Sequence, residues 1–381
     1  MEGYLINYEL KIKILTPVYI GSGYTVGKRE YIHDKSKNLV SFLDLEKLFK
    51  GILENGLYSE YEKYFIADNK NREMNVELKQ FLERAGIGED KYSEWITYSE
   101  YMGSSDLRLQ NTHEIQTFIK DAYGNPYIPG SSLKGAIRTI LESCYIRKNY
   151  NEFDRSRDEV KKEEMKGKTR YMSASQNHIK EKAFHRRITD DKVKLENMQN
   201  DIMRGIIVGD SRPIDKTSLC ICQKIDLSTK GNKKSLNVLR ECLNPKTVVT
   251  VPLTIDSKIM RNMYGKKFDL EDIIADINMF YKNYKEEYVC KFYNAPMVKD
   301  EKNAFYLGGG SGYVSKTVTH SLFNKDNATK VVSKILNEVF TQKYKPSANK
   351  DDEVLGVSPH TLKCTNYKDS LCQMGLCRIV D

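Results

Sequence analysis

The chain lacks several features that would assign it to common classes of protein. It contains no run of 18 apolar residues, which excludes a membrane-spanning helix of ordinary length. The first 15 residues alternate apolar with polar or charged side chains, so they lack the continuous apolar centre of a secretory signal. We therefore predict a cytoplasmic protein that has no membrane partner.

Metal-binding signals are also scarce. The eight cysteines include no Cys-x-x-Cys pair, although closely paired ligands are typical of zinc sites. Cys220 and Cys222 alternate with Leu219 and Ile221, which is typical of one face of a strand. We predict reduced thiols, no metal site and no cofactor, with a zinc site as the weaker alternative.

The charge and aromatic content favour an acidic partner. Lys and Arg total 61 against 52 Asp and Glu, which gives a net charge of +9. The excess is moderate and is consistent with nucleic acid as a partner. Tyrosine is abundant, at 25 residues against one tryptophan. Tyrosines beside cations suit base stacking, although most of them are equally well explained as ordinary amphipathic residues.

The most informative stretch is residues 127–138, which read Tyr-Ile-Pro-Gly-Ser-Ser-Leu-Lys-Gly-Ala-Ile-Arg. This pattern predicts a short strand, a Pro-Gly turn and the start of a helix, with Ser131 or Ser132 as the N-cap. Lys134 and Arg138 lie one turn apart on the polar face, so the helix start would suit a phosphate. A plain strand-turn-helix with solvated cations is the alternative. The predicted buried stripe consists of Leu133, Ala136, Ile137, Ile140, Leu141 and Cys144.

A glycine-rich loop follows Phe305-Tyr306-Leu307. It is not a nucleotide P-loop, because Ser315 stands where a glycine would have to precede Lys316. A dinucleotide fingerprint fails as well, since no acidic residue follows a βα unit at the needed spacing. A loop without side-chain bulk lets a polymer backbone come close, whereas a structural hairpin is the alternative. The candidate phosphate-binding residues are Gly308, Gly309, Gly310, Ser311, Gly312 and Lys316.

The rest of the chain mixes short strands with isolated helices. Alternation over residues 6–14 predicts a half-buried strand, and Ser41 is expected to cap a helix over about 42–53. Residues from about 146 to 204 are rich in charge, which predicts an exposed, partly helical insertion or, alternatively, a basic arm along a phosphate backbone. The fold class is therefore predicted to be α+β with antiparallel sheets. Two units are expected, 1–205 with the insertion and 206–381.

Four motifs in this order resemble the RAMP superfamily of CRISPR RNA-binding proteins. They are residues 127–138, Leu-Thr-Pro-Val-Tyr-Ile-Gly-Ser-Gly at 15–23, Leu-Gly-Gly-Gly-Ser-Gly at 307–312, and the tail segments 358–363 and 374–377. The tail is similar to that of the fifth Csm subunit of type III-A effector complexes. The motifs extend from residue 15 to residue 377, so the resemblance covers the whole chain.

This resemblance implies two ferredoxin-like (RRM-like) units and a place in an RNA-guided antiviral assembly. It implies binding of CRISPR RNA, a cap on the 3′-end side of a filament of backbone subunits, and help in maturation of the RNA intermediate. The implied partners are the neighbouring RAMP subunits, a small helical subunit, target RNA and a host nuclease. It also adds Gly21, Ser22 and Gly23 to the candidate RNA-binding residues.

An enzyme is the competing prediction, since some RAMP relatives are metal-independent endoribonucleases. Such a nuclease needs a general base and acid, commonly a histidine with a partner. None of the six histidines (His33, His113, His178, His185, His320, His360) lies in a pattern that pairs it with one. For metal-dependent cleavage Asp210 is the best single candidate, but no second carboxylate lies near it in sequence. We therefore predict a non-catalytic subunit.

Overall fold

A computed structural model describes residues 4–67, 76–104, 114–162, 173–188, 193–299, 301–341 and 351–380. Its strands are β1 (Leu5–Ile14), β2 (Gly21–Val26), β3 (Tyr31–Asp34), β4 (Leu39–Leu43), β5 (Ile96–Met102), β6 (Ile115–Phe118), β7 (Ile206–Val208), β8 (Leu219–Ser228), β9 (Lys233–Leu243), β10 (Val248–Asp256), β11 (Ala304–Tyr306), β12 (Thr361–Tyr367), β13 (Ser370–Gln373) and β14 (Leu376–Val380). Its α-helices are α1 (Leu45–Glu54), α2 (Tyr58–Ile66), α3 (Leu78–Arg84), α4 (Glu89–Tyr92), α5 (Gly130–Lys148), α6 (Asp154–Lys162), α7 (Ser173–Phe184), α8 (Ser257–Tyr264), α9 (Leu270–Glu287), α10 (Thr319–Leu322), α11 (Lys325–Thr341) and α12 (Asp352–Leu355).

The strands form two sheets, and the α+β class is confirmed. The first sheet has the order β11-β14-β1-β10-β7, and all its pairings are antiparallel. The second has the order β2-β6-β9-β8-β5-β4-β3, with β12 and β13 attached through β8. It is mixed, because β5 pairs parallel with β8 and β6 pairs parallel with β9. The prediction of purely antiparallel sheets therefore holds for the first sheet and is wrong for the second.

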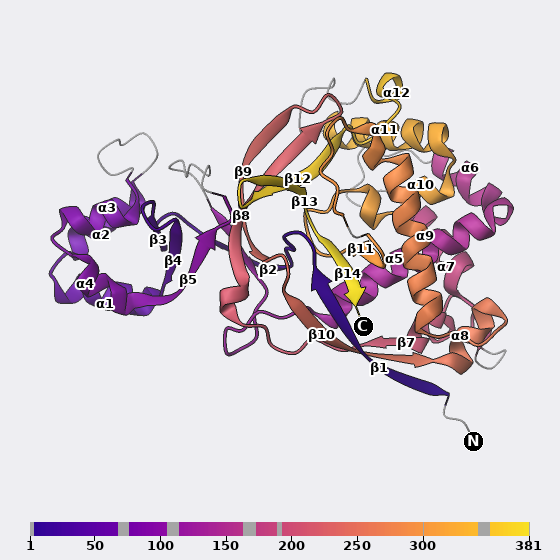
Figure 1. Ribbon diagram of the computed structural model, residues 1–381, viewed down its shortest axis with the longest axis horizontal. Coiled ribbons are helices and arrows are strands. Elements are labelled where there is room, and N and C mark those ends of the chain that lie inside the picture. The colour runs from indigo at the N-terminus through magenta and orange to yellow at the C-terminus, as the bar shows by residue number, and fades with distance from the viewer. Residues whose placement is uncertain are drawn as a thin grey trace.

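Both sheets take strands from both halves of the sequence. β1 lies between β10 and β14, with Leu10 opposite Val251 and Ile12 opposite Ile379. Figure 1 shows β3 and β4 with α1–α4 in a lobe at the left, joined through β5 to the second sheet. The division into units 1–205 and 206–381 remains a prediction. In both sheets, strands from one side of this boundary pair with strands from the other.

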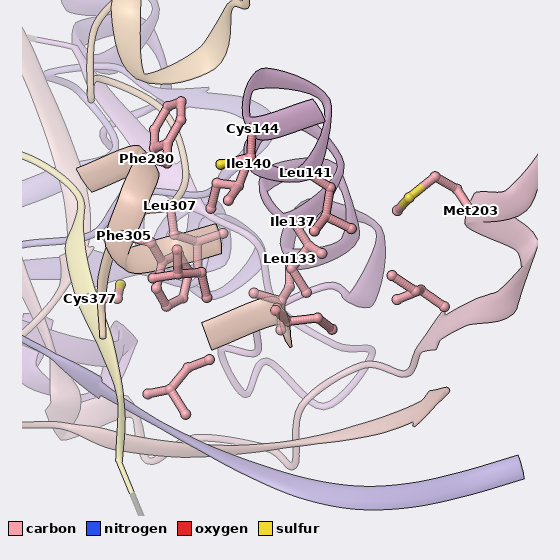
Figure 2. Close-up of a cluster of buried hydrophobic side chains, with 14 of the residues drawn as sticks. Leu133, Ile137, Ile140, Leu141, Cys144, Met203, Phe280, Phe305, Leu307 and Cys377 are labelled. Carbon is pink, nitrogen blue, oxygen red and sulfur yellow. The ribbon is translucent and has the colours of Figure 1, made fainter. Parts of the chain in front are cut away.

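The main core lies between the first sheet and the helices. Five of the six residues in the predicted stripe of α5 are buried: Leu133, Ile137, Ile140, Leu141 and Cys144 are each at most 2% exposed, whereas Ala136 is only partly buried at the edge of the core. Figure 2 shows these side chains in one cluster with residues of α9, β11 and β14. Each fully buried Leu or Ile contributes roughly 2 kcal/mol relative to leaving it in water. The stripe therefore fixes the rotation of α5, and with it the direction of its polar face.

The charged segment 146–204 is helical as predicted, but it is not an excursion from the core. Phe153, Val160, Ile179 and Phe184, from the segment that contains α6 and α7, belong to the main core cluster. Arg157 is itself buried and donates to the Tyr150 carbonyl at 2.8 Å. The described part of the segment is therefore a packed helical layer, and its residues 163–172 and 189–192 lie outside the described residues.

Several local predictions were wrong for identifiable reasons. Ser41 lies in β4, and the cap of α1 is Asp44, whose carboxylate accepts from the backbone of Glu46 and Lys47. No strand forms at 126–128, where Pro126 makes only an isolated bridge to Lys120. The tail, where the sequence predicts two short strands over residues 358–380, holds three, β12, β13 and β14.

Candidate nucleic-acid interface

The glycine-rich loop packs against the motif at residues 15–23. The backbone N–H of Gly309 donates to the carbonyl of Tyr19 at 2.6 Å, in an isolated antiparallel bridge. Gly308 has φ +78°, and a Cβ built there would lie 2.2 Å from the Tyr19 carbonyl oxygen. The absence of bulk at these two positions therefore serves the chain's own backbone. It holds two motifs that lie almost 300 residues apart in sequence side by side.

Arg240, on β9, completes this junction, and sequence reasoning missed it together with its strand. Its guanidinium lies 4.9 Å from the centroid of the Tyr19 ring, and its Nε donates to Gln116 Oε1 at 2.9 Å. The buried Nη1 has no hydrogen-bond partner among the described residues. A Cβ on Gly310, which has φ +84°, would lie 2.5 Å from that atom. The glycine thus leaves the space that the guanidinium occupies.

Lys316 lies beyond the glycines, at the end of the short 3₁₀ turn η7 (Val314–Lys316). Its side chain is exposed at the surface, yet partial burial lowers the pKa of its ammonium, and the nearby charge of Arg240 lowers it further. Lys316 and Arg240 therefore repel each other electrostatically. A phosphate would relieve their repulsion, and this favours an anionic ligand here.

The serines in these motifs have different environments. Ser311 is 3% exposed, and its hydroxyl donates to the Gly308 carbonyl at 3.3 Å, so it supports the loop from inside. Ser22 shares a 2.6 Å hydrogen bond with Thr117 and accepts from the backbone N–H of Tyr24. Gly21 and Gly23 are exposed, as is the side chain of Tyr24, at 78%. Tyr24 is an open aromatic surface that the sequence did not single out.

The start of α5 is arranged differently from the prediction. The helix begins at Gly130, the N-cap position is Pro129, and neither Ser131 nor Ser132 caps it. The carboxylate of Asp210 accepts from the backbone N–H of Gly130 at 2.7 Å. A carboxylate thus already satisfies one of the free N–H groups that the sequence suggested for a phosphate. Ser131 is exposed and Ser132 is half-buried, so both hydroxyls lie within the first turn.

The two cations of α5 differ in how free they are. Arg138 donates to Asp201 at 2.9 Å, and its guanidinium lies 4.7 Å from the centroid of the Phe184 ring. Arg138 therefore holds α7 and the turn at Asp201, which leaves it less free to contact a ligand. Lys134 is half-buried, and burial lowers the pKa of its ammonium, against the opposing effect of Asp201. Lys134 is thus the better candidate for a cation that meets a ligand.

A cavity of about 500 Å³ connects the α5 face to the glycine-rich loop. Arg138, Thr139 and Glu142 line it from α5, and Tyr313, Lys316 and Thr317 line it from the loop. The two regions that the sequence singled out therefore border one space. Neither region is closed off from solvent, since both Ser131 and Lys316 are exposed.

Glu142 is the buried acid of this cavity. It is 5% exposed, and burial raises the pKa of its carboxyl to about 7, although Arg138 and Lys180 lower it and Asp201 raises it. The ordinary value is 4.5, so the folded chain holds this proton more tightly than the unfolded chain does. Folding stability is therefore expected to fall as the pH rises from about 4.5 to 7.

Replacing Glu142 by glutamine should remove that pH-dependent cost. At pH 8 the Glu142→Gln variant is expected to have a free energy of unfolding about 3 kcal/mol above that of the original chain, because a pKa difference of about 2.5 units is abolished. Near pH 4.5 the gain should disappear. Urea unfolding at the two pH values measures it, with Glu46→Gln, an exposed acid on α1, as the control. An equal effect of Glu142→Gln at both pH values would contradict the assignment.

The residues considered for catalysis are not gathered at this junction. Asp210 caps α5, and burial, helped by the nearby charge of Arg147, lowers the pKa of His320 to about 4. His360 is bonded to Asp352 at 2.6 Å, which raises the pKa of its imidazole. His113 lies outside the described residues. Within the described ranges, no three His, Cys, Asp or Glu side chains are placed to hold a metal ion.

No helix in the described ranges is long and apolar enough to cross a membrane.

Comparisons with known proteins give a consistent result. The sequence profile of the RAMP superfamily matches residues 11–314. A Streptococcus thermophilus protein named "CRISPR system Cms protein Csm5" is 30% identical over 320 residues, which cover 82% of this chain and 80% of the relative. A protein of the same name from Enterococcus italicus is 26% identical and covers 97% of this chain and 96% of its own length.

Two solved structures share the fold. One is a chain of the cryo-EM structure of a Csm-crRNA-target RNA ternary complex in a type III-A CRISPR-Cas system, with TM-score 0.64 and 21% identity, covering 98% of this chain and 100% of that one. The other is the crystal structure of T. onnurineus Csm5, with TM-score 0.60 and 16% identity, covering 97% and 99%. At these identities the likeness concerns the fold alone.

Proposed function

The chain belongs to the RAMP superfamily and, within it, to the Csm5 proteins, and on this premise we propose that it is a CRISPR RNA-binding subunit of a type III-A effector complex. It works in the cytoplasm beside the neighbouring RAMP subunits and the small helical subunit of that complex. It caps the 3′-end side of the backbone filament and assists maturation of the RNA intermediate. Target RNA and a host nuclease are further partners in this proposal.

The observation that carries the proposal is the junction of Tyr19 and Gly309, joined at 2.6 Å. Arg240 lies over the Tyr19 ring, which also borders the exposed Gly21, and the charge of Arg240 acts on Lys316. Paired cations, open backbone and an exposed tyrosine in one place suit a sugar-phosphate strand whose bases stack. Gly308–Gly310 pack against Tyr19 and Arg240 beneath this surface, while Gly21, Gly23, Ser131, Gly312, Lys134 and Lys316 are the members of the predicted set proposed to meet the RNA.

The first sheet supports a ferredoxin-like interpretation. The elements β1, α5, β7, β10, α9 and β14 follow one another in the order βαββαβ, and their strands lie in the sheet as β14-β1-β10-β7. The helices α5 and α9 pack against each other in the main core. We propose that this is one RRM-like unit, assembled from both halves of the chain, with β11 added at its edge. We propose that the second sheet belongs to the other RRM-like unit.

The proposal is tested by recovering the chain from its own cells and identifying what accompanies it. RNA sequencing of the bound fraction should give CRISPR repeat-spacer RNA of narrow length range, and mass spectrometry should give the other subunits of the complex. RNA of random sequence and length, without those subunits, would contradict the proposal and favour a general RNA-binding protein.

A non-catalytic role is part of the proposal, and the endoribonuclease is the alternative. Because Asp210 caps α5 through an oxygen that asparagine also has, Asp210→Asn is expected to change the free energy of unfolding by less than about 0.5 kcal/mol and to have no effect on RNA integrity. The measurement is urea unfolding together with incubation of labelled precursor RNA, with and without Mg²⁺. Cleavage by the original chain that Asp210→Asn, His33→Ala or His113→Ala abolishes would establish the nuclease instead.

A further inference from the structure

The cavity between α5 and the glycine-rich loop is large and is lined by both apolar and charged side chains. Its volume is about 500 Å³, within the range of small-molecule sites. Side chains from five helices, α5, α6, α7, α10 and α11, line it together with the loop residues before α10. Its apolar walls include Val160, Ile179, Leu322, Phe323 and Ile335.

One acid inside the cavity lacks a protein partner. Glu142 is 5% exposed, and among the described residues no donor lies within hydrogen-bond distance of its carboxyl group. Arg138, one turn earlier on the same helix, gives its hydrogen bond to Asp201. A buried carboxyl group without donors is costly unless a ligand supplies them. The oxygens of Glu142 are not sealed away from the cavity, so a ligand that presents N–H groups can reach them.

The same cavity also carries cations. Lys180 from α7 and Lys316 from the loop line it with Arg138, and Lys316 is exposed to solvent. A ligand that fits must then combine N–H donors at a flat apolar end with a negative charge at the other. A fatty acid offers the charge without the donors, and an extended peptide presents its N–H groups singly instead of as an adjacent pair. A nucleotide whose base enters first offers both, and guanine carries adjacent N1–H and N2–H donors on one edge.

We propose that this cavity binds a guanine nucleotide, with the base inside against Phe323 and its N–H edge on Glu142, and the phosphate outside near Lys180 and Lys316. The inference rests on the proposed function, because the nucleotide is an unstacked residue of the bound RNA strand. A free guanine mononucleotide has the same chemistry and is the second source. Base recognition of this kind is usual for single-stranded RNA, whose bases are accessible on their Watson–Crick edges.

The test compares short RNA strands that differ at one base. The purified full chain is titrated with a uridine octamer, with the same octamer carrying one guanosine, with the octamer carrying inosine at that place, and with GMP alone. We expect the guanosine strand to bind about 10-fold more tightly than the uridine strand, the usual scale of discrimination by one good base contact. Inosine lacks the 2-amino group and should give a smaller preference.

Glu142→Gln should abolish the preference for guanosine while the uridine octamer binds as before, and Glu46→Gln should change neither. Binding of GMP alone, if Glu142→Gln abolishes it, assigns the site to free nucleotides too, and either source supports the cavity. Equal binding of the guanosine and uridine strands by the original chain overturns the inference yet leaves the proposed function intact. Failure of every RNA strand to bind overturns both. The original chain alone decides, even if the variant does not fold.

Discussion

Gly130→Ala is expected to lower the free energy of unfolding by about 3 kcal/mol, at the upper end of overpacking effects. A Cβ at this position would lie 2.3 Å from the Val208 carbonyl oxygen and 2.6 Å from that of Gly209, so backbone must move. The hydrogen bond from Gly130 to Asp210 would be disturbed in the same step. Urea or thermal unfolding measures the loss.

The matched control lies on the same helix. A Cβ at Gly135 meets nothing within 4 Å, and alanine is a better helix former than glycine. Gly135→Ala should therefore raise the free energy of unfolding by about 1 kcal/mol. Similar losses for the two variants would contradict the close packing of Gly130 against the backbone of Val208 and Gly209.

The second large effect concerns RNA affinity. A Lys134→Ala, Lys316→Ala double variant is expected to bind single-stranded RNA about 100-fold more weakly at moderate salt, if each ammonium contributes about 1.5 kcal/mol through a charged hydrogen bond. The slope of log affinity against log salt should fall by about 1.4, since each single-strand phosphate contact accounts for about 0.7. Arg138 is left in place because Asp201 and Phe184 depend on it.

The control removes the same charge elsewhere. Lys258 of α8 and Lys267, just beyond it, are both exposed, so Lys258→Ala, Lys267→Ala changes the net charge by the same amount. Its salt slope should stay close to that of the original chain. An unchanged slope in the Lys134 and Lys316 variant, or an equal loss in both variants, would remove this face from the path of the RNA.

Periodicity predicted the elements whose burial is one-sided. The 3.6-residue stripe of α5 and the two-residue alternation of β1 are each set by one apolar face, and both are present. The sequence left the start of α9 open between Asp269 and Asp272; Asp269 is the N-cap, and the two residues form a capping box. β9 was missed because its polar residues do not alternate with its apolar ones: Lys233–Ser235 are consecutive, as are Arg240 and Glu241. Its pairing with β8 is what places it in the sheet.

The candidate site could be predicted only in part because its chemistry comes from distant contacts. The glycines at 308–310 were predicted to let the backbone of a polymer ligand come close, but the sequence cannot show that Tyr19 and Arg240 of the same chain lie against them. The capping of α5 by Asp210 is likewise a contact across 80 residues. A local rule assigned the cap to Ser131 or Ser132, because it considers only residues next to the helix start.

The central claim is that RNA lies along the junction of residues 15–24 with the glycine-rich loop. Photo-cross-linking of the native complex with 4-thiouridine RNA, followed by mass spectrometry of the peptides, tests it most directly. The account predicts cross-links in the peptides that contain Tyr19 or Tyr24 and in those that contain Tyr313 or Lys316. Cross-links confined to the α1–α4 lobe or to α8, with none in these peptides, would contradict it.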